Sequence, residues 1–203
     1  MFAIGWMTGP GIAQADPVKI VALGDSLSAG YLLPANDAFP AKLEAALKKN
    51  GHEVTIVNAG VSGDTSNGGL ARLDWSVPSD ADGVILELGA NDALRGINPE
   101  QTRAALEEIA KKLQGRNVKL LIAGMLAPPN LGETYAGAFN PIFKDLSEKY
   151  DAVYYPFFLD GVAAVPSLNL QDGMHPTAEG VDVIVERILP SVEQLIEKIE
   201  PTS

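Results

Sequence analysis

Short apolar runs alternate with amphipathic stretches along most of the chain. The runs are rich in valine, isoleucine and leucine and lack a strict polar alternation, which is typical of strands buried on both faces of a sheet. They cover residues 19–23, 54–57, 84–88, 118–123 and 153–158. The pattern predicts five buried strands.

The stretches between these runs have the spacing of helices. Residues 38–49 and 99–114 place an apolar side chain on successive helical turns, and residues 133–150 and 178–199 fit helices that a proline bends or breaks. The apolar positions and the two prolines are Phe39, Leu43, Leu47, Leu106, Ile109, Leu113, Pro141 and Pro190. Strands that alternate with helices predict an α/β fold, with a parallel sheet and helices on both of its faces.

Small and polar residues follow the first three predicted strands. The segments are 24–28 (GDSLS), 58–65 (NAGVSGDT) and 89–92 (GAND). Open parallel sheets bind ligands at the carboxyl ends of their strands, so we expect these segments to meet at one edge of the sheet. Turn formation alone explains some of these residues, because glycine, serine, asparagine and aspartate are common in turns.

The composition narrows the available chemistry. The chain has 203 residues, no cysteine and only two histidines, which excludes disulfides, thiol nucleophiles and cysteine-based zinc sites. Its formal net charge of -11, from 15 Lys+Arg against 26 Asp+Glu, argues against a nucleic-acid partner and is otherwise explained by solubility. No apolar run approaches the ~20 residues needed to span a bilayer, so we expect no integral membrane segment.

The first 15 residues differ from the rest of the chain. They carry no charge and end in the triplet AQA, which resembles a signal-peptide cleavage site, although no basic residue precedes them and the GPG at 9–11 interrupts the apolar part. We expect residues 1–15 to be a signal-peptide remnant or an N-terminal arm, and residues 16–203 to form a single domain. The expected location is periplasmic or secreted, with a cytoplasmic location as the alternative.

One of the two histidines suits a catalytic role. His52 precedes the second predicted strand, at the sheet edge opposite the polar segments, and is expected in a surface turn. His175 lies in the segment DGMHP with Asp172 three residues earlier, so a tight loop would let the carboxylate accept the ring N–H. Ser26, after the first strand, is the candidate nucleophile for this histidine. Taken singly, the serine also fits a helix cap, and the histidine loop also fits a turn that enters a helix.

Together, the four polar segments resemble the sequence blocks of the GDSL, or SGNH, hydrolase superfamily. The stretches GDSLSAGY, SGDTSNGGLARL, ELGANDALRG and DGMHP are closely similar to its bacterial multifunctional thioesterase I, lysophospholipase and arylesterase type. The resemblance extends from Lys19 to Leu195. It implies a three-layer α/β/α sandwich with a five-stranded parallel sheet of flavodoxin-like strand order 2-1-3-4-5.

The resemblance also implies a serine esterase with an acyl-enzyme intermediate. Ser26 would be the nucleophile, His175 the general base, and Asp172 the carboxylate that orients the base. The oxyanion hole would consist of the Ser26 backbone N–H, the Gly63 backbone N–H and the Asn91 side-chain amide. The implied site has no metal and no organic cofactor, and its substrate is a small ester or thioester with an apolar acyl or aryl group.

The residue types at these positions suit that chemistry. The tetrahedral intermediate of acyl transfer carries a negative charge that preorganised N–H donors stabilise. We expect Ser26 and Gly63 each to begin a helical segment, where backbone N–H groups are free of intrahelical partners. Asp25 and Asp92 are not expected to act as catalytic acids. They are expected to brace their loops by accepting hydrogen bonds from backbone N–H groups.

Two other classes of protein are alternatives. An α/β-hydrolase would carry its serine in a G-x-S-x-G elbow, whereas Ser28 stands at the last glycine position here. A non-catalytic flavodoxin-like binding module would use the same edge of the sheet, but the chain lacks the common phosphate-binding glycine motifs. The acidic residues Asp25, Asp64 and Asp92 also disfavour an anionic ligand.

The apolar residues near these segments point to the substrate class. Leu94, residues 125–129 and Met174 favour an acyl or aryl group over a sugar, with an SGNH carbohydrate acetylesterase as the alternative. The loop at 75–83, rich in Pro, Ser and Asp, is expected to form a mobile wall of the cleft. The expected activity is hydrolysis of aryl and acyl esters, with thioesters and lysophospholipids as further candidates.

Overall fold

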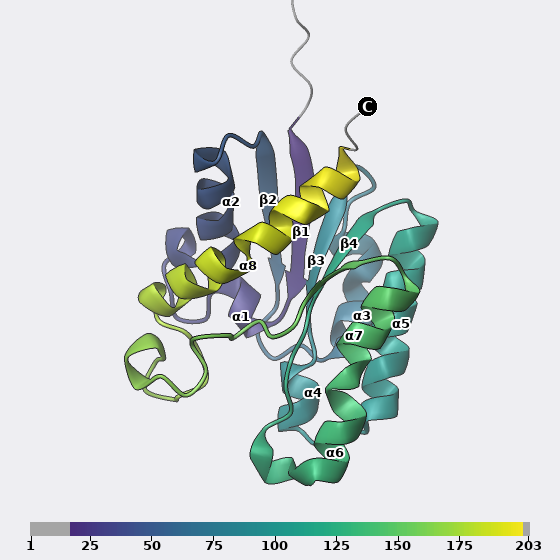
Figure 1. Cartoon of the computed structure of the whole chain (residues 1–203), viewed down its shortest axis with the longest axis vertical. Coiled ribbons are helices and arrows are strands. Elements are labelled where there is room, and N and C mark those ends of the chain that lie inside the picture. Colours follow the sequence, from purple (N-terminus) through teal and green to yellow (C-terminus); the bar gives the residue numbers. More distant parts are fainter. Residues whose placement is uncertain (1–16, 201–203) are drawn as a thin grey trace, which may run out of the picture.

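Five parallel strands form one sheet in the computed structural model, which describes residues 17–200 (Figure 1). The strands are β1 (Val18–Gly24), β2 (Val54–Gly60), β3 (Gly83–Glu87), β4 (Lys119–Ala123) and β5 (Val153–Tyr155). Their order is β2-β1-β3-β4-β5, so β1 lies between β2 and β3. The five predicted strands and the predicted order are confirmed.

Helices cover both faces of the sheet. On one face α2 (Phe39–Lys49) packs against α8 (Ala178–Ile199), and on the other α5 (Pro99–Gly115) contacts α3 (Ser66–Ser76) and α7 (Pro141–Lys149) (Figure 1). The shorter helices are α1 (Ser26–Ala29), α4 (Ala90–Leu94) and α6 (Gly132–Phe139), and 3-10 turns occur at Ala35–Asp37, Pro129–Leu131 and Pro166–Leu168. The architecture is the predicted three-layer α/β/α sandwich.

The apolar stripes predicted for α2 and α5 are buried in the core. Their six side chains are at most 1% exposed. Fully burying one such aliphatic or aromatic side chain stabilises the fold by roughly 1.5–3 kcal/mol. At the start of α5 the Asn98 side chain accepts the N–H of Glu100, and Pro99 has no N–H that needs an acceptor, so this end of the helix is capped.

Prolines end two of the predicted elements, the first as predicted and the second earlier than predicted. Residues 133–150 are two helices, α6 and α7, that meet at Asn140, because Pro141 has no N–H to continue the first helix. The last strand ends at Tyr155 and not at residue 158, because Pro156 cannot donate to the strand ladder. Pro190, in contrast, lies inside α8 without ending it.

Gly60 allows the end of β2 to lie directly against α1. A Cβ at this position would be 2.3 Å from the nitrogen and 2.7 Å from the Cα of Ala29, both backbone atoms that cannot turn away. We therefore expect Gly60→Ala to lower the free energy of unfolding by about 1–3 kcal/mol, measured by urea denaturation. Gly115→Ala is the control, because a Cβ there meets no atom within 4 Å. Equal stability of the two variants would contradict this prediction.

Candidate active site

Ser26, Gly63 and Asn91 each follow one of three neighbouring strands. β1 ends at Gly24, Asp25 caps α1, and Ser26 is the first residue of that helix. Gly63 follows β2, and Asn91 lies in the first turn of α4, after β3. Because β1 lies between β2 and β3, these segments meet at one edge of the sheet, as predicted.

Ser26, His175 and Asp172 form a continuous hydrogen-bonded chain. The Nε2 atom of His175 lies 3.0 Å from Ser26 Oγ, and its Nδ1 atom lies 2.7 Å from Asp172 Oδ2. Ser26 is 8% exposed, so its hydroxyl faces a largely enclosed space. This spacing lets a proton pass from the serine hydroxyl to the imidazole.

The loop that carries Asp172 and His175 is closed by its own backbone. The N–H of Leu170 donates to the carbonyl of His175 at 2.7 Å, and Asp172 Oδ1 accepts the N–H groups of Met174 and His175 at 2.9 and 3.0 Å. These backbone hydrogen bonds, with that from the His175 ring, lower the pKa of Asp172 to about 2. The carboxylate is therefore ionised at neutral pH and favours the tautomer of His175 that is protonated on Nδ1.

Gly63 lies in a turn and not at a helix start. Its φ is 85°, a left-handed conformation that favours glycine, and the N–H of Asp64 donates to the carbonyl of Val61 across the turn. Arg95 Nη2 donates to the Gly63 carbonyl at 2.7 Å. The expectation that Gly63 begins a helix is wrong, because Asp64 and Thr65 separate it from Ser66, where α3 begins. The turn and Arg95, rather than a helix terminus, orient its peptide groups.

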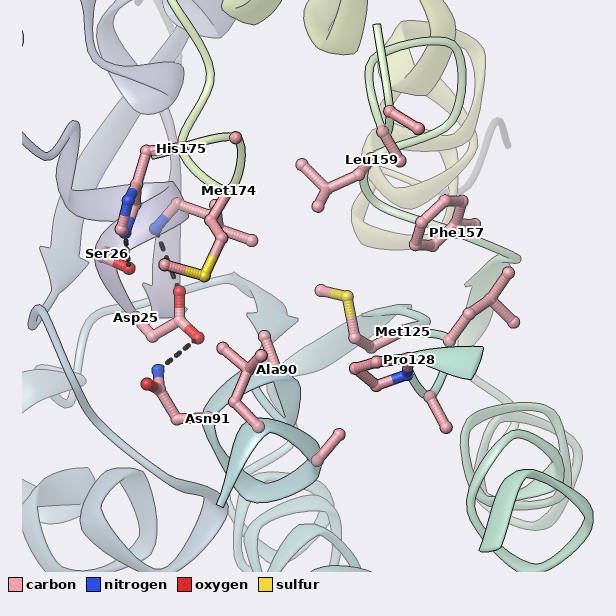
Figure 2. A pocket seen from close by; sticks show the side chains of 18 of the residues that line it. Asp25, Ser26, Ala90, Asn91, Met125, Pro128, Phe157, Leu159, Met174 and His175 are labelled. Carbon is pink, nitrogen blue, oxygen red and sulfur yellow. Dashed lines mark hydrogen bonds between the residues drawn. The ribbon is translucent and has the colours of Figure 1, made fainter. Parts of the chain in front are cut away.

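The two aspartates next to the site residues bind backbone N–H groups, as predicted. Asp25 accepts the N–H of Leu27 at 2.9 Å, and Asp92 accepts the N–H of Ser66 at 2.8 Å. Asp25 also accepts a hydrogen bond from the side-chain amide of Asn91 at 3.0 Å (Figure 2). Both aspartates are completely buried.

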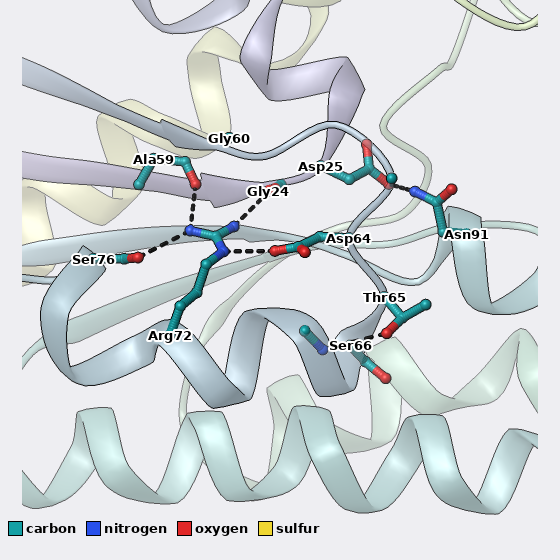
Figure 3. A network of polar contacts seen from close by, with 12 residues as sticks. Gly24, Asp25, Ala59, Gly60, Asp64, Thr65, Ser66, Arg72, Ser76 and Asn91 are labelled. Atoms are coloured by element: carbon teal, nitrogen blue, oxygen red, sulfur yellow. Dashed lines mark hydrogen bonds and ion pairs between the residues drawn. The ribbon is translucent and has the colours of Figure 1, made fainter.

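Arg72 joins the strand ends beneath the site, and the sequence reasoning did not identify it. Its guanidinium donates to the carbonyls of Gly24 and Ala59 at 2.8 Å each and pairs with Asp64 (Figure 3). The residue is 8% exposed, and the planar guanidinium satisfies several acceptors at once. The only sequence signal is a basic residue inside the apolar stretch GLARL.

Glu87, at the end of β3, is the second buried residue that sequence reasoning missed. Its Oε2 atom accepts the hydroxyl of Ser28 at 2.8 Å and the N–H of Asp25 at 3.3 Å. Burial, together with the negative charge of Asp25, raises the pKa of Glu87 well above its ordinary value. Burial likewise raises the pKa of Asp25 to about 6. Of the two acids, Glu87 is the more strongly affected, because it is completely buried beside the Asp25 charge.

A third residue that sequence reasoning missed lies against the imidazole. The ring of Tyr31 is 4.4 Å from that of His175, centroid to centroid, at an interplanar angle of 37°. Such contact limits rotation of the imidazole and keeps its Nε2 atom aimed at Ser26. Tyr31 belongs to the stretch GDSLSAGY, but nothing in its spacing indicates a contact with a residue near the other end of the chain.

An elongated cavity of about 630 Å³ opens beside Ser26 (Figure 2). Asp25, Ser26, Asn91 and His175 lie at one end of it, and the other walls are mainly apolar. The apolar lining includes Leu94, Met125, Leu126, Pro128, Phe157, Leu159 and Met174. The apolar residues predicted near the site therefore line it, and the cavity suits an apolar group attached to a reactive carbonyl.

The loop at 75–83 does not belong to this cavity. It leads into β3, and the N–H of Asp82 donates to the carbonyl of Lys19 at the amino end of the sheet. The prediction that it forms a wall of the cleft is wrong, because the cavity opens at the carboxyl ends of the strands. His52 precedes β2 at this same far end, where its Nε2 atom lies 3.5 Å from Glu193, as expected for a histidine outside the site.

Comparisons with known proteins agree with this geometry. The model of the GDSL-like Lipase/Acylhydrolase family matches residues 22–183. Esterase TesA of Pseudomonas aeruginosa is 35% identical over 184 residues, which cover 90% of this chain and 92% of the relative. An arylesterase of Vibrio mimicus is 38% identical over 172 residues, which cover 83% of this chain and 84% of the relative. Thioesterase 1/protease 1/lysophospholipase L1 of Escherichia coli K12 is 37% identical over 185 residues, which cover 91% of this chain and 86% of the relative.

Solved structures are similar over nearly the same length. The crystal structure of AlinE4, an SGNH-hydrolase family esterase, has a TM-score of 0.76 at 45% identity and covers 90% of this chain and 98% of its own. The crystal structure of TesA has a TM-score of 0.83 at 35% identity, and the match covers 87% of this chain and 99% of TesA.

Proposed function

Since this chain belongs to the GDSL-like lipase/acylhydrolase family and is an esterase, we propose that it cleaves esters by acyl transfer to Ser26. The observation that carries this proposal is the hydrogen-bonded chain of Ser26, His175 and Asp172, with distances of 3.0 and 2.7 Å. Family membership favours an enzyme over the binding module that the sequence left as an alternative.

In the acylation step, Ser26 Oγ attacks the ester carbonyl carbon and its proton moves to Nε2 of His175. The carbonyl oxygen becomes an oxyanion, which the N–H groups of Ser26 and Gly63 and the Asn91 amide stabilise. Within residues 17–200, neither of these backbone N–H groups has a protein acceptor, which supports this role. The carbon–oxygen bond to the alcohol then breaks, and the alcohol leaves with the proton from His175.

In the deacylation step, water replaces the alcohol. The water oxygen attacks the acyl carbonyl carbon while His175 takes a proton from the water. His175 then gives that proton to Ser26 Oγ as the carboxylic acid leaves. Asp172 remains ionised and stabilises the imidazolium in both steps. Acid pH should therefore abolish turnover by protonating His175, and a rate that stays flat from about pH 8 to about pH 4 would contradict the base assignment.

We propose aryl and acyl esters as the substrate class, with thioesters and lysophospholipids included. The apolar length of the cavity supports an acyl or aryl group, and the names of the arylesterase and thioesterase 1/lysophospholipase L1 relatives agree with it. A carbohydrate acetylesterase would need more polar side chains and aromatic platforms beside Ser26. The lining beyond Asn91 and Asp25 offers few polar groups of that kind.

A substrate panel tests this proposal. Nitrophenyl esters of short and long acids, a naphthyl ester, an acyl-CoA, a lysophospholipid and an acetylated sugar are compared for kcat/KM. We expect activity on both short and long acyl esters. Selectivity for the acetylated sugar alone would contradict the substrate class, and failure of a fluorophosphonate to label the protein would contradict the acyl-enzyme.

We also propose that the protein is exported, on the pattern of its first 15 residues, which lie outside the described residues. No helix within residues 17–200 has the length and apolar character of a membrane span. Expression of the full chain in a bacterial host, followed by mass measurement of the periplasmic fraction, tests export. We expect a mature chain that starts at Asp16, and a full-length cytoplasmic chain would contradict the proposal.

A further inference from the structure

The carboxylate of Asp25 connects two separate parts of the site. Its Oδ1 atom accepts the backbone N–H of Leu27 at 2.9 Å and so caps α1, which begins with Ser26. Its Oδ2 atom accepts a side-chain N–H of Asn91, on α4, at 3.0 Å (Figure 2). Asp25 is completely buried and borders the cavity. One side chain thus holds the Asn91 amide relative to the helix that carries the nucleophile.

The amide of Asn91 needs such a constraint. Its two ends have opposite chemistry, because the nitrogen carries two donors and the oxygen is an acceptor, and rotation of the amide exchanges them. An oxyanion is stabilised by the donor end and repelled by the oxygen. An ionised carboxylate only accepts hydrogen bonds, so Asp25 selects the orientation that turns the nitrogen of Asn91 toward it.

We propose that Asp25 is a positioning residue of the oxyanion hole: it binds one N–H of Asn91 and thereby keeps the second N–H available to the substrate oxyanion. Asp25 acts through Asn91 and takes no proton from the substrate. The inference rests on the proposed function, since it assumes that Asn91 binds the oxyanion.

The burial of Asp25 and the charges that face it determine the pH range in which Asp25 is ionised and can hold Asn91. Burial raises the pKa of Asp25 to about 6, and the negative charge of Asp64 adds to this, whereas the hydrogen bonds from Leu27 and Asn91 and the charge of His175 oppose it. Glu87 accepts the backbone N–H of Asp25, and burial together with the Asp25 charge raises the pKa of Glu87 well above its ordinary value, which favours its neutral form. Above about pH 6 Asp25 is an acceptor only, and below that pH its proton removes the constraint on Asn91.

The variant Asp25→Asn isolates this constraint. Asparagine caps a helix as well as aspartate does, so its oxygen can still accept the N–H of Leu27. Its nitrogen would then meet the nitrogen of Asn91, donor against donor, and the Asn91 amide has to turn away. We expect kcat to fall roughly 10- to 100-fold, less than the ~10²–10³ that follows complete loss of one donor, with a small change in KM.

A double-mutant cycle shows whether Asp25 acts through Asn91. Asn91→Ala should reduce kcat by ~10²–10³. In that background, adding Asp25→Asn should reduce kcat by less than about threefold, because the group that Asp25 positions is already gone. Full activity of Asn91→Ala would overturn both the oxyanion role of Asn91 and this inference. If the two single substitutions instead lower kcat independently, so that their factors multiply in the double variant, this inference is overturned and the proposed function remains intact.

Two measurements that do not depend on turnover separate positioning from a structural role. The side-chain NH₂ signals of Asn91, assigned by their absence from Asn91→Ala, should shift with a midpoint near pH 6 in the native protein and not in Asp25→Asn. The Tm of Asp25→Asn at pH 8 should not fall, because a carboxyl whose folded pKa is raised weakens the fold as pH rises from the unfolded pKa to the folded one, and that loss is complete at pH 8.

The matched control is Glu44→Gln, since Glu44 also accepts a backbone N–H, from Ile56 at 2.7 Å, far from the cavity. It should leave kcat and the Asn91 signals unchanged. An Asn91 signal that titrates identically in the native protein and in Asp25→Asn would overturn the inference, as would a loss of kcat in Asp25→Asn no larger than in Glu44→Gln.

Discussion

Ser26→Ala is expected to lower kcat for every ester substrate by about 10⁶, because the variant has no oxygen to form the acyl-enzyme. The oxyanion donors and the cavity remain in place, so substrate binding should persist and KM should change little. Residual turnover would come from direct attack of water in a site that still stabilises the oxyanion, which is worth ~10³–10⁴ over the reaction in water. Among the other single substitutions in the site, only removal of the His175 imidazole should cost as much.

The measurement combines steady-state kinetics with mass spectrometry after fluorophosphonate treatment. The native chain should gain one adduct on Ser26, and Ser26→Ala should gain none. The control is Ser28→Ala, since Ser28 also lies on α1 but donates its hydroxyl to Glu87. Ser28→Ala should still gain the adduct on Ser26, even if this variant is less stable than the native protein. An adduct on Ser26→Ala, or none on Ser28→Ala while it remains folded, would show that a different residue is the nucleophile.

Local patterns in the sequence were sufficient for most of the fold. Buried strands and amphipathic helices each follow from the spacing of apolar side chains, and that spacing located all five strands. The strand order came from the resemblance of the four polar segments to a known family, because spacing alone does not say which strands are neighbours. The error in boundary arose at Pro156, whose missing N–H ends the last strand before its apolar run ends. The spacing also predicted that Pro141 bends or breaks its helix, and the structure shows a break there.

The misplaced loop at 75–83 shows a different limit. Its Pro, Ser and Asp content fits an exposed loop equally well at either edge of the sheet. Only the direction of the chain decides the edge, since a segment that enters a parallel strand lies opposite the segments that leave the strands. Gly83 begins β3, so the loop lies at the amino edge and cannot contact the cavity.

Within the site, residues in short motifs were predictable and their supporting residues were not. Ser26 and His175 stand in segments whose residue types already suggest chemistry. Arg72, Glu87 and Tyr31 support them through contacts with residues far away in the chain, and no local pattern marks such contacts. A buried charged residue becomes recognisable only when the structure shows which acceptors it satisfies.

Asp172→Asn is expected to lower kcat by about 10⁴ while leaving the fold and the serine intact. The asparagine oxygen can still accept the N–H groups of Met174 and His175, which close the loop. Its nitrogen, however, then faces Nδ1 of His175 and requires that atom to accept a hydrogen bond. The ring proton moves to Nε2, where it points at Ser26 and prevents the imidazole from taking the serine proton.

The pH profile of the native enzyme provides an independent test of this role. Because backbone hydrogen bonds lower the pKa of Asp172 to about 2, the carboxylate stays ionised from neutral to mildly acid pH. Any loss of activity at mildly acid pH should therefore not come from protonation of Asp172. The control is Asp151→Asn, an exposed aspartate that pairs with Lys198 away from the cavity, and its kcat should be unchanged.

The rate of covalent labelling distinguishes orientation of the base from loss of the nucleophile. Asp172→Asn keeps the serine hydroxyl, so a fluorophosphonate should still modify Ser26 completely, but at a rate reduced in proportion to kcat. Ser26→Ala should never be modified, however long the reaction runs. Labelling of Asp172→Asn at the native rate would mean that His175 needs no carboxylate to hold its tautomer, and that Asp172 serves only to close its loop.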